Sequence, residues 1–366
     1  MLAPPTTLLA PSSKTSLAKR SYKTLLTCLG WCRAPLWFLA LFTEAKSFAD
    51  NPILGSEALN RAGLHVWRLR IAHALTLSRR KRLAKNVPPK LREQFDRDGF
   101  VVVENFLPGE DFAQLQQALL NTEFECRAQQ QGDTITRRVA VGPELQRRVP
   151  SLARLLRSAR WRNLIAYVAS TRSRPFYYIQ TIAGGVASGP EDPQVELHSD
   201  TFHPSLKAWL FLTDVEQDER PLTYVAGSHR LSPERIAWEQ RKSVDVLRGG
   251  DRLSQRGSFR IRPDELQELG LPQPTRFCLR ANTLVIADTC GFHARASADK
   301  PTVRVELWAY CRRNPFLPWT GSALLSWSSL AARRVEYVHK LVDWLDRRGL
   351  RKQHWQPAGH RRPIDV

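Results

Sequence analysis

Apolar and polar residues alternate with different periods in different parts of the chain. Within the first hundred residues, apolar side chains at helical spacing predict one amphipathic helix over residues 56–83. They are Leu64, Trp67, Ile71 and Leu75. The remaining positions are rich in arginine, and the segment ends in the basic run 79–82. Such a helix suits a membrane surface, and the alternative is a solvated charged face on a packed helix.

Short periodic segments follow. Residues 95–99 (Phe-Asp-Arg-Asp-Gly) are expected to form a turn, and residues 100–103 (Phe-Val-Val-Val) a strand. Helical spacing predicts a short helix around residues 112–119 and another over 151–169.

From Pro175 onward, apolar residues come in short runs between turn signals, and these runs predict β-strands. They cover residues 176–182, 208–213, 222–225, 283–287 and 303–310. A last helix is expected over 333–348, before a basic tail. Short strands with turn punctuation predict a sandwich or barrel rather than repeated β-α-β units. The fold class expected is therefore mainly β with flanking helices.

An apolar stretch, residues 25–42, precedes all of these elements. Arg33 and Pro35 interrupt it, and a transmembrane helix needs about 20 mostly apolar residues. No small-residue cleavage motif of a signal peptide follows it. The stretch is expected either to lie in a membrane interface through its aromatic residues or to pack on the protein's own core.

The composition favours a folded protein with a basic N-terminal region. The chain has 366 residues, 42% of them hydrophobic, and a net charge of +20, enough for one large domain with appendages or for two modest ones. Residues 1–95 carry 16 Lys/Arg against 4 Asp/Glu. Such a segment seeks phosphate, whether in lipid headgroups, phosphorylated sugars or nucleic acid. Nucleic acid is the least favoured partner because no base-stacking or groove-reading element is recognisable.

Cysteine usage indicates a reducing compartment. None of the six cysteines forms a C-x-x-C pair, which disfavours both a disulfide framework and a zinc ribbon. They are Cys28, Cys32, Cys126, Cys278, Cys290 and Cys311. We therefore expect a cytoplasmic protein, with peripheral attachment to the inner face of a membrane as an extension of that expectation.

The triplet His198-Ser199-Asp200 is the first candidate for chemistry. In a strand, residues i and i+2 share one face, so both side chains could reach one ion. His293 lies 93 residues after Asp200, beyond a strand-like run. Two imidazoles and one carboxylate on one face form the facial triad of non-haem iron(II) oxygenases, which leaves positions open for co-substrate and O₂. Taken alone, the triplet also fits a solvated histidine and a turn aspartate.

Arg304 strengthens the catalytic interpretation. It lies eleven residues after His293 in a predicted strand. Burying an arginine inside a barrel is costly unless it is paired, and the guanidinium fork suits a carboxylate held through two hydrogen bonds. The distal carboxylate of 2-oxoglutarate is such a partner. The alternative is a surface arginine in an ordinary ion pair.

Taken together, these motifs make residues 95–313 resemble the phytanoyl-CoA dioxygenase family of Fe(II)/2-oxoglutarate oxygenases. The resemblance rests on residues 95–108 (FDRDGFVVVENFLP), 198–200 (HSD), 220–230 (RPLTYVAGSHR) and the H-x₁₀-R spacing from His293 to Arg304. It implies a double-stranded β-helix (jelly-roll) core, iron(II) held by His198, Asp200 and His293, and 2-oxoglutarate and O₂ as co-substrates. It further implies that Arg304 anchors 2-oxoglutarate.

The resemblance also offers weaker candidates and a domain division. Gln180 resembles a family position that contacts the co-substrate, but it could equally be an ordinary half-buried strand amide. Trp209 could form part of the wall around the co-substrate, but it could equally be a buried core residue. The expected division is a basic helical region at 1–90, an oxygenase domain at 91–320, and a helix with a basic tail at 321–366. Because every catalytic candidate lies beyond it, a chain starting near Asn86 is expected to retain activity.

The function expected is hydroxylation of an unactivated C–H bond. A basic, partly apolar N-terminal region favours a lipid-linked or phosphorylated substrate, such as an acyl-CoA, a lipid or a sugar of a membrane glycolipid, at an anionic membrane surface. The alternatives are a hydroxylase of a soluble small metabolite, a non-catalytic binding module on the same fold, and a zinc hydrolase, in which Arg304 would have no role.

Overall fold

Two antiparallel β-sheets form the centre of the protein. The computed structural model describes residues 33–298, 300–322 and 329–365. Within them the larger sheet has eight strands, in the order β1 (Phe100–Val103), β8 (Leu284–Asp288), β5 (Leu206–Phe211), β10 (Thr302–Cys311), β4 (Phe176–Gly184), β3 (Thr134–Ala140), β2 (Phe124–Gln131) and β11 (Gln356–Arg361). The smaller sheet has the order β7 (Thr275–Arg276), β6 (Leu222–Tyr224) and β9 (His293–Arg295).

The two sheets pack on each other through an apolar cluster to which both contribute. Trp209 and Trp308 of the larger sheet belong to it, together with Tyr224 of the smaller one. A second and larger cluster lies on the other face of the main sheet, where Val305 and Leu307 are fully buried. Alternate residues of β10 therefore point to opposite faces, one toward the inter-sheet space and one toward a layer of helices. The jelly-roll expectation is confirmed.

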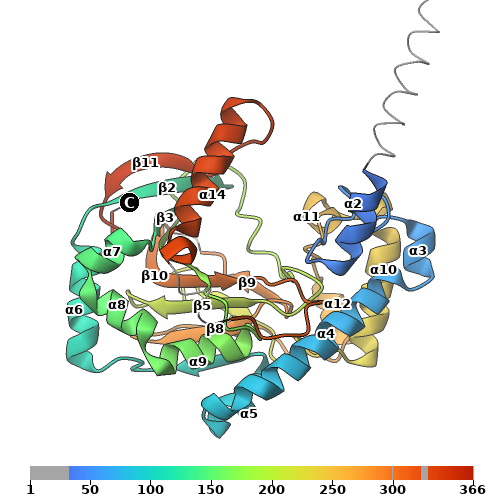
Figure 1. Ribbon diagram of the computed structural model, residues 1–366, viewed down its shortest axis with the longest axis horizontal. Helices are drawn as coiled ribbons and strands as arrows, with labels where there is room; N and C mark the ends of the chain where they lie inside the picture. The colour runs from blue at the N-terminus through green and yellow to red at the C-terminus, as the bar shows by residue number, and fades with distance from the viewer. Residues whose placement is uncertain (1–32, 299, 323–328, 366) are drawn as a thin grey trace, which may run out of the picture.

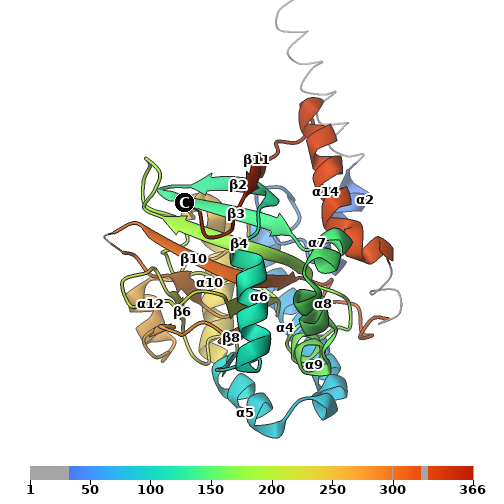
Figure 2. The same cartoon turned by 90° about the vertical axis from the view of Figure 1, so that its left-hand side faces the viewer.

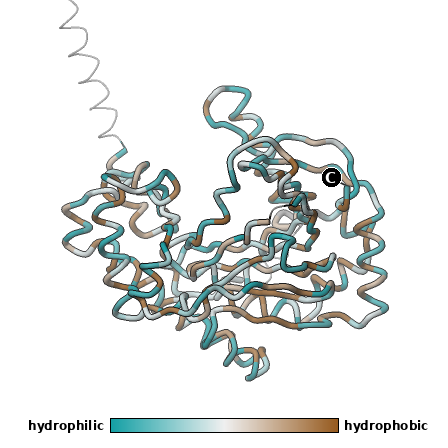
Figure 3. The backbone as a smooth tube through the Cα atoms, turned by 180° about the vertical axis from the view of Figure 1, so that it is seen from behind, coloured by the Kyte–Doolittle hydropathy of each residue, from teal (hydrophilic) through white to brown (hydrophobic). Residues whose placement is uncertain are grey.

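Helices surround this β-centre on several sides (Figures 1 and 2). The outer face of the main sheet is covered by α6 (Gly109–Leu120), α8 (Pro150–Arg157) and α9 (Ala159–Val168), with α7 (Pro143–Arg148) beside them. The remaining helices are α2 (Ala34–Leu39), η1 (Ala40–Phe42), α3 (Glu57–Arg61), α4 (Leu64–Leu83), η2 (Ala84–Asn86), α5 (Pro89–Asp98), α10 (Pro233–Gly249), α11 (Arg252–Gln255), α12 (Pro263–Glu268) and α14 (Ser329–Arg347). Hydropathy along the backbone (Figure 3) shows apolar stretches in the strands and in the helices that cover them.

The N-terminal helical segment differs from its expected form. It is two helices, α3 and α4, because Gly63 adopts a left-handed conformation (φ 98°) between them. The expected polar face of α4 is largely its buried face, which includes Arg68, Arg79 and Arg80. Trp67, from the expected apolar stripe, is 43% exposed. The interpretation of α4 as a helix with an outward basic face was therefore wrong.

These arginines are buried because each finds acceptors on distant elements. Arg68 donates to three backbone carbonyls in residues 41–45, at 2.7–3.0 Å. Arg80 donates to the carboxylate of Asp288 at 2.7 Å, and Asp288 ends strand β8 with its side chain fully buried. Helix α4 is thus attached to the β-core by charge-assisted hydrogen bonds, which are stronger than neutral ones.

Other expectations need smaller corrections. Residues 95–99 are not a free turn: they end helix α5, and Gly99 closes it with φ 84°. The helix expected over 151–169 is broken at Ser158, which caps α9 through its side chain. Helix α10 was missed in the strand-rich region. The basic tail is in part strand β11, which pairs with β2 at the edge of the main sheet.

The apolar N-terminal stretch is described only from Arg33 onward, so residues 25–32 lie outside the described part of the chain. The described portion forms α2 and η1, and three of its side chains are more than half exposed: Leu36, Phe38 and Leu39. No helix in the described ranges is both long and apolar enough to cross a membrane.

Candidate metal and co-substrate site

Three predicted ligands come together between the two sheets. The ligand atoms of His198, Asp200 and His293 all lie within 4.8 Å of one another, and no other group of this kind is found among the described residues. Asp200 Oδ1 is 3.8 Å from His198 Nε2 and 3.7 Å from His293 Nε2. These separations suit three ligands around one ion.

The backbone that carries these side chains is tied together locally. His198 and His293 exchange both backbone hydrogen bonds at 3.0 Å, forming an isolated antiparallel bridge rather than a continuous strand. The backbone N–H of Asp200 donates to the carbonyl of Thr289. His198 and Asp200 direct their ligand atoms toward each other as expected, although His198 lies in the bridge and Asp200 in a bend rather than in a regular strand.

Hydrogen bonds fix which imidazole nitrogen faces the centre. His198 Nδ1 lies 2.7 Å from the carbonyl of Glu196, and His293 Nδ1 lies 3.0 Å from the carbonyl of Gly291. A carbonyl can only accept, so Nδ1 carries the proton in both rings and Nε2 presents a lone pair to the centre. Backbone carbonyls that accept from Nδ1 in this way orient metal-binding histidines.

The electrostatics favour the protonation states that a metal needs. Burial lowers the pKa of His198 well below its usual value, with His293 adding to the effect, and lowers the pKa of His293 to about 4. Burial alone would raise the pKa of Asp200, but the ammonium of Lys207 and the two imidazoles outweigh it and hold that pKa well below its usual range. Neutral imidazoles and an ionised carboxylate bind metal without releasing protons.

Asp200 Oδ2 gives a further test of the fit. It is buried and accepts no well-directed hydrogen bond among the described groups, although Lys207 Nζ lies 2.7 Å away. The ammonium of Lys207 can rotate its three protons, so one of them can point at Oδ2. The remaining lone pairs are available to a cation, so the residues present fit an iron(II) ion.

A row of polar side chains crosses the sheet beside this centre. Arg138 on β3, Gln180 on β4 and Glu306 on β10 are direct cross-strand neighbours. Gln180 accepts from Arg138 Nε at 2.8 Å and donates to Glu306 at 2.7 Å. Glu306 also accepts from Arg304 Nε at 2.9 Å. The carboxamide of Gln180 is therefore already engaged at both ends by protein groups.

Arg304 keeps hydrogen-bonding capacity toward the cavity. Its Nη1 donates to the carbonyl of Arg220 at 2.9 Å, and its Nε is used by Glu306. A guanidinium has five N–H donors, so most remain for another acceptor. The alternative, a surface arginine in an ordinary ion pair, does not apply, because Arg304 is 5% exposed and its ion pair with Glu306 is buried.

All six residues singled out from the sequence line one cavity of about 540 Å³: His198, Asp200, His293, Arg304, Gln180 and Trp209. The same cavity contains basic side chains that the sequence analysis missed: Lys46, Arg138, Lys207, Arg295 and Arg312. Asp200 is its only acidic lining residue among the described ones. Lys207 lies one residue before the strand expected over 208–213, so its place on the same strand face as Trp209 could have suggested it. Lys46 had no such signal.

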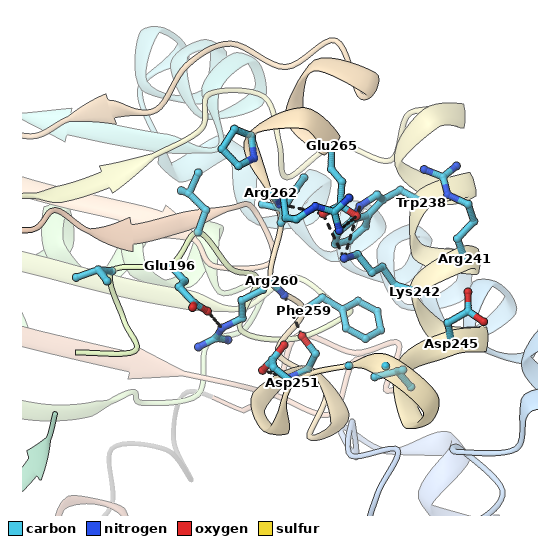
Figure 4. Close-up of a pocket in the computed structure, with 18 residues that line it drawn as sticks. Glu196, Trp238, Arg241, Lys242, Asp245, Asp251, Phe259, Arg260, Arg262 and Glu265 are labelled. Atoms are coloured by element: carbon cyan, nitrogen blue, oxygen red, sulfur yellow. Dashed lines mark hydrogen bonds and ion pairs between the residues drawn. The ribbon is translucent and has the colours of Figure 1, made fainter. Parts of the chain in front are cut away.

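A larger cavity, of about 900 Å³, is a different one (Figure 4). It lies between α10, α11 and α12 and shares no lining residue with the metal-site cavity, although Leu197 directly precedes His198. Several of its basic side chains are paired within it, as Lys242 is with Glu265 at 2.9 Å and Arg260 with Glu196 at 3.4 Å. Volume alone would therefore misplace the chemistry, and the donor set identifies the smaller cavity.

Two imidazoles and one carboxylate that converge inside a double-stranded β-helix form the donor set of a mononuclear non-haem iron centre. His203 and His229, which lie close in sequence to the motifs, are not part of it. His229 instead packs against Phe95, at 5.7 Å between ring centroids.

The comparison with protein families agrees with this class. The family model of phytanoyl-CoA dioxygenase (PhyH) matches residues 95–246, a segment that includes His198 and Asp200 and ends before His293. Over this segment the chain is similar to the phytanoyl-CoA dioxygenase family. This match and the ligand set identify a non-haem iron, 2-oxoglutarate-dependent oxygenase. Iron, 2-oxoglutarate and O₂ are accordingly its cofactor and co-substrates. A search of curated proteins finds no match.

The chain is also similar, at low sequence identity, to several solved structures. The epimerase SnoN from nogalamycin biosynthesis, in complex with Fe³⁺, α-ketoglutarate and nogalamycin RO, is 21% identical over 64% of this chain and 91% of its own, with a TM-score of 0.41. HygX from Streptomyces hygroscopicus, with nickel, 2-oxoglutarate and hygromycin B bound, is 16% identical over 61% and 86%, with a TM-score of 0.37. EctD from S. alaskensis with bound Fe is 17% identical over 62% and 76%, with a TM-score of 0.35.

Proposed function

We propose that this oxygenase hydroxylates an unactivated C–H bond of a lipid-linked or phosphorylated substrate, with His198, Asp200 and His293 as its iron ligands. Arg304 is proposed to hold the distal carboxylate of 2-oxoglutarate. The observation that carries the substrate class is the charge of the cavity. Six basic side chains line it, against Asp200 in the lining and the two buried carboxylates, Asp192 and Glu306, that pair with Arg295 and Arg304. Such an excess attracts anions and raises their local concentration.

The chain's own residues hold and orient the reacting groups. The carbonyls of Glu196 and Gly291 keep both Nε2 atoms directed at the centre. Arg304, held by Glu306, offers its free N–H groups to a carboxylate at a fixed distance from these ligands. When bound, iron(II) together with 2-oxoglutarate supplies the oxidising chemistry. Buried Trp209 and Trp308 wall the cavity and limit the access of water.

Succinate release from 2-oxoglutarate tests this proposal. The panel contains an acyl-CoA, a phosphorylated glycolipid sugar and an uncharged small metabolite, each added to the iron-loaded enzyme. We expect the phosphorylated compounds to stimulate turnover above the substrate-free rate. A stimulated rate with the uncharged metabolite alone would favour the alternative, a soluble small-molecule hydroxylase. The absence of iron-dependent 2-oxoglutarate turnover under every condition would favour a non-catalytic binding module.

We further propose that the N-terminal region attaches the enzyme to an anionic membrane surface. Three arginines of α4 point inward, so this proposal now rests on the apolar side chains of α2. Leu36 is 65% exposed and Leu39 is 59% exposed. Apolar insertion supplies binding energy at a bilayer interface, and nearby basic residues add to it.

Vesicle co-sedimentation checks the attachment. The full chain is expected to bind anionic vesicles at low salt and to bind less as salt rises, because charges are screened over about 8–10 Å at physiological ionic strength. Leu36→Gln/Leu39→Gln should reduce binding. The control Leu77→Gln/Leu350→Gln changes leucines that are 56% and 69% exposed elsewhere and should not. Equal binding by both double variants would show that α2 does not contact the membrane.

A further inference from the structure

A basic cavity continues the metal-site cavity toward the molecular surface. It has a volume of about 550 Å³ and lies against α14 and the loop that leads to β11. Five residues line both cavities, which are therefore adjacent: Gln129, Arg138, Tyr178, Val338 and Trp355. Four cations line the second cavity, and we refer to Arg138, Arg256, Arg351 and Lys352 together as the basic trough.

The charge of the basic trough is not neutralised by the protein. Its described lining contains no aspartate or glutamate, and two histidines, His339 and His354, accompany the four cations. The side chains of Arg256, Arg351 and Lys352 are exposed and form no hydrogen bond or ion pair with any other described residue. In the larger cavity of Figure 4, by contrast, Lys242 is paired with an acid.

Arg138 connects the trough to the metal site and is held in a defined position. Its guanidinium carbon lies 4.1 Å from the ring centroid of Trp308 and 4.2 Å from that of Trp355, so it is sandwiched between two indoles. Nε is engaged by Gln180, and no described residue accepts from the two terminal nitrogens. Burial lowers the pKa of Arg138 to about 10, which still leaves it charged at neutral pH.

We propose that the basic trough binds a part of the substrate that carries two or more phosphate groups. This inference rests on the proposed function, since it places the substrate's charged part in the trough while the carbon to be hydroxylated lies near His198, Asp200 and His293. One guanidinium is enough to bind one carboxylate through two hydrogen bonds, and Arg304 is proposed to bind the distal carboxylate of 2-oxoglutarate in this way. Four further unpaired cations along an open cavity match a group with several charges. Arginine is well suited to phosphate because it donates two parallel hydrogen bonds.

The test measures binding of fructose 1,6-bisphosphate and of fructose 6-phosphate by calorimetry. The full chain is loaded with iron(II) and 2-oxoglutarate and kept anaerobic. The bisphosphate is expected to bind at least about tenfold more tightly than the monophosphate, because each charged hydrogen bond contributes about one power of ten. Arg351→Gln/Lys352→Gln should weaken the bisphosphate about tenfold or more. These two residues lie in an exposed loop, so the variant tests the site without disturbing the core.

A matched control removes the same number of charges elsewhere. Arg241 and Arg280 are 59% and 80% exposed at the side chain and pair with Glu268 and Asp214, away from the trough. Arg241→Gln/Arg280→Gln should leave bisphosphate binding within about twofold. Equal losses in the two double variants would show a general charge effect and overturn the proposal, as would equal affinity of the wild type for the two sugars.

Arg138→Gln separates the trough from the co-substrate site. It should weaken the bisphosphate about tenfold or more while Arg304 still binds 2-oxoglutarate. An equal loss of 2-oxoglutarate binding would assign Arg138 to the co-substrate and overturn its role here. The wild type distinguishes failure of the proposed function from failure of the trough proposal. If it binds the bisphosphate but never turns over 2-oxoglutarate, the phosphate site is supported and the hydroxylase activity is refuted.

The source of the phosphates is resolved by two further ligands. A soluble nucleoside diphosphate such as ADP, and vesicles that contain phosphatidic acid, are each tested with the wild type and with Arg351→Gln/Lys352→Gln. Tight binding of ADP that the variant loses indicates a soluble substrate. Vesicle binding that the variant loses, with weak ADP binding, indicates a lipid headgroup. Binding of neither ligand, with the sugar bisphosphate also inert, would refute the proposal.

Discussion

Loss of the Arg80–Asp288 ion pair should destabilise the whole protein, although both residues lie outside the ligand set. Asp288 is fully buried and Arg80 is 5% exposed, with 2.7 Å between Nη2 and Oδ2. The Asp288 carboxylate also accepts from the backbone N–H groups of Ser205 and Cys290. Removing one partner of a buried pair leaves an uncompensated charge and costs about 3–5 kcal/mol. Arg80→Met should therefore lose about that much unfolding free energy.

The same variant should change how stability depends on pH. Burial by itself would raise the pKa of Asp288, but Arg80 outweighs it and holds that pKa below its usual value. In the wild type this carboxylate therefore stabilises the fold above the unfolded-state pKa of about 3.9 and loses that contribution as pH falls. Without Arg80, burial should raise the pKa of Asp288. The penalty of Arg80→Met is then largest at neutral pH and shrinks toward pH 4.

Thermal and denaturant unfolding measure this effect. At an unfolding entropy of about 2.1 cal/mol/K per residue, a loss of 3–5 kcal/mol lowers the Tm by about 4–6 °C. Lys81→Met is the matched control, because Lys81 is the next residue of α4 and is exposed. It should change stability by less than about 0.5 kcal/mol. The double variant Arg80→Met/Asp288→Asn should recover part of the loss. A stability of Arg80→Met equal to that of Lys81→Met would refute the reasoning.

The pair also revises the expectation for a shortened chain. A chain starting near Asn86 lacks all of α4, including Arg68 and Arg80, and so leaves Asp288 buried without its cation. Thr289, whose carbonyl fixes the backbone of Asp200, directly follows Asp288. We therefore expect such a chain to be poorly folded and to bind iron weakly, contrary to the expectation from the sequence. Soluble, fully active protein from residue 86 onward would contradict this.

Three further predictions concern the site. His198→Ala and Asp200→Ala should each abolish iron(II) binding in anaerobic reconstitution, whereas His203→Gln should still bind one iron per chain. Arg304→Gln should raise the KM for 2-oxoglutarate about tenfold or more at unchanged iron content, since a charged hydrogen bond contributes about 1.5–3 kcal/mol; an unchanged KM would assign the distal carboxylate to another residue. Gln180→Leu should raise the same KM about fivefold, a loss of about 1 kcal/mol, if it acts by holding the carboxylate that orients Arg304.

The sequence alone was sufficient for features that depend on local spacing. In the H-x-D triplet the two ligands are two residues apart in the sequence, and Arg304 follows His293 by eleven residues in a predicted strand. Both spacings can be recognised without a structure. Strands such as β4 and β10 were also predictable, because one of their faces packs against the apolar core and therefore carries an apolar pattern.

The tertiary structure decided what depends on partners far away in the sequence. Strands β2 and β3 were missed because their inner faces line a polar cavity, so residues such as Gln129 and Arg138 replace the apolar alternation of a core strand. The orientation of α4 was predicted wrongly because Arg80 is buried in an ion pair with Asp288, which lies 208 residues later in the chain. Burying an arginine is unfavourable until its acceptor is in place, and only the folded chain brings the two together.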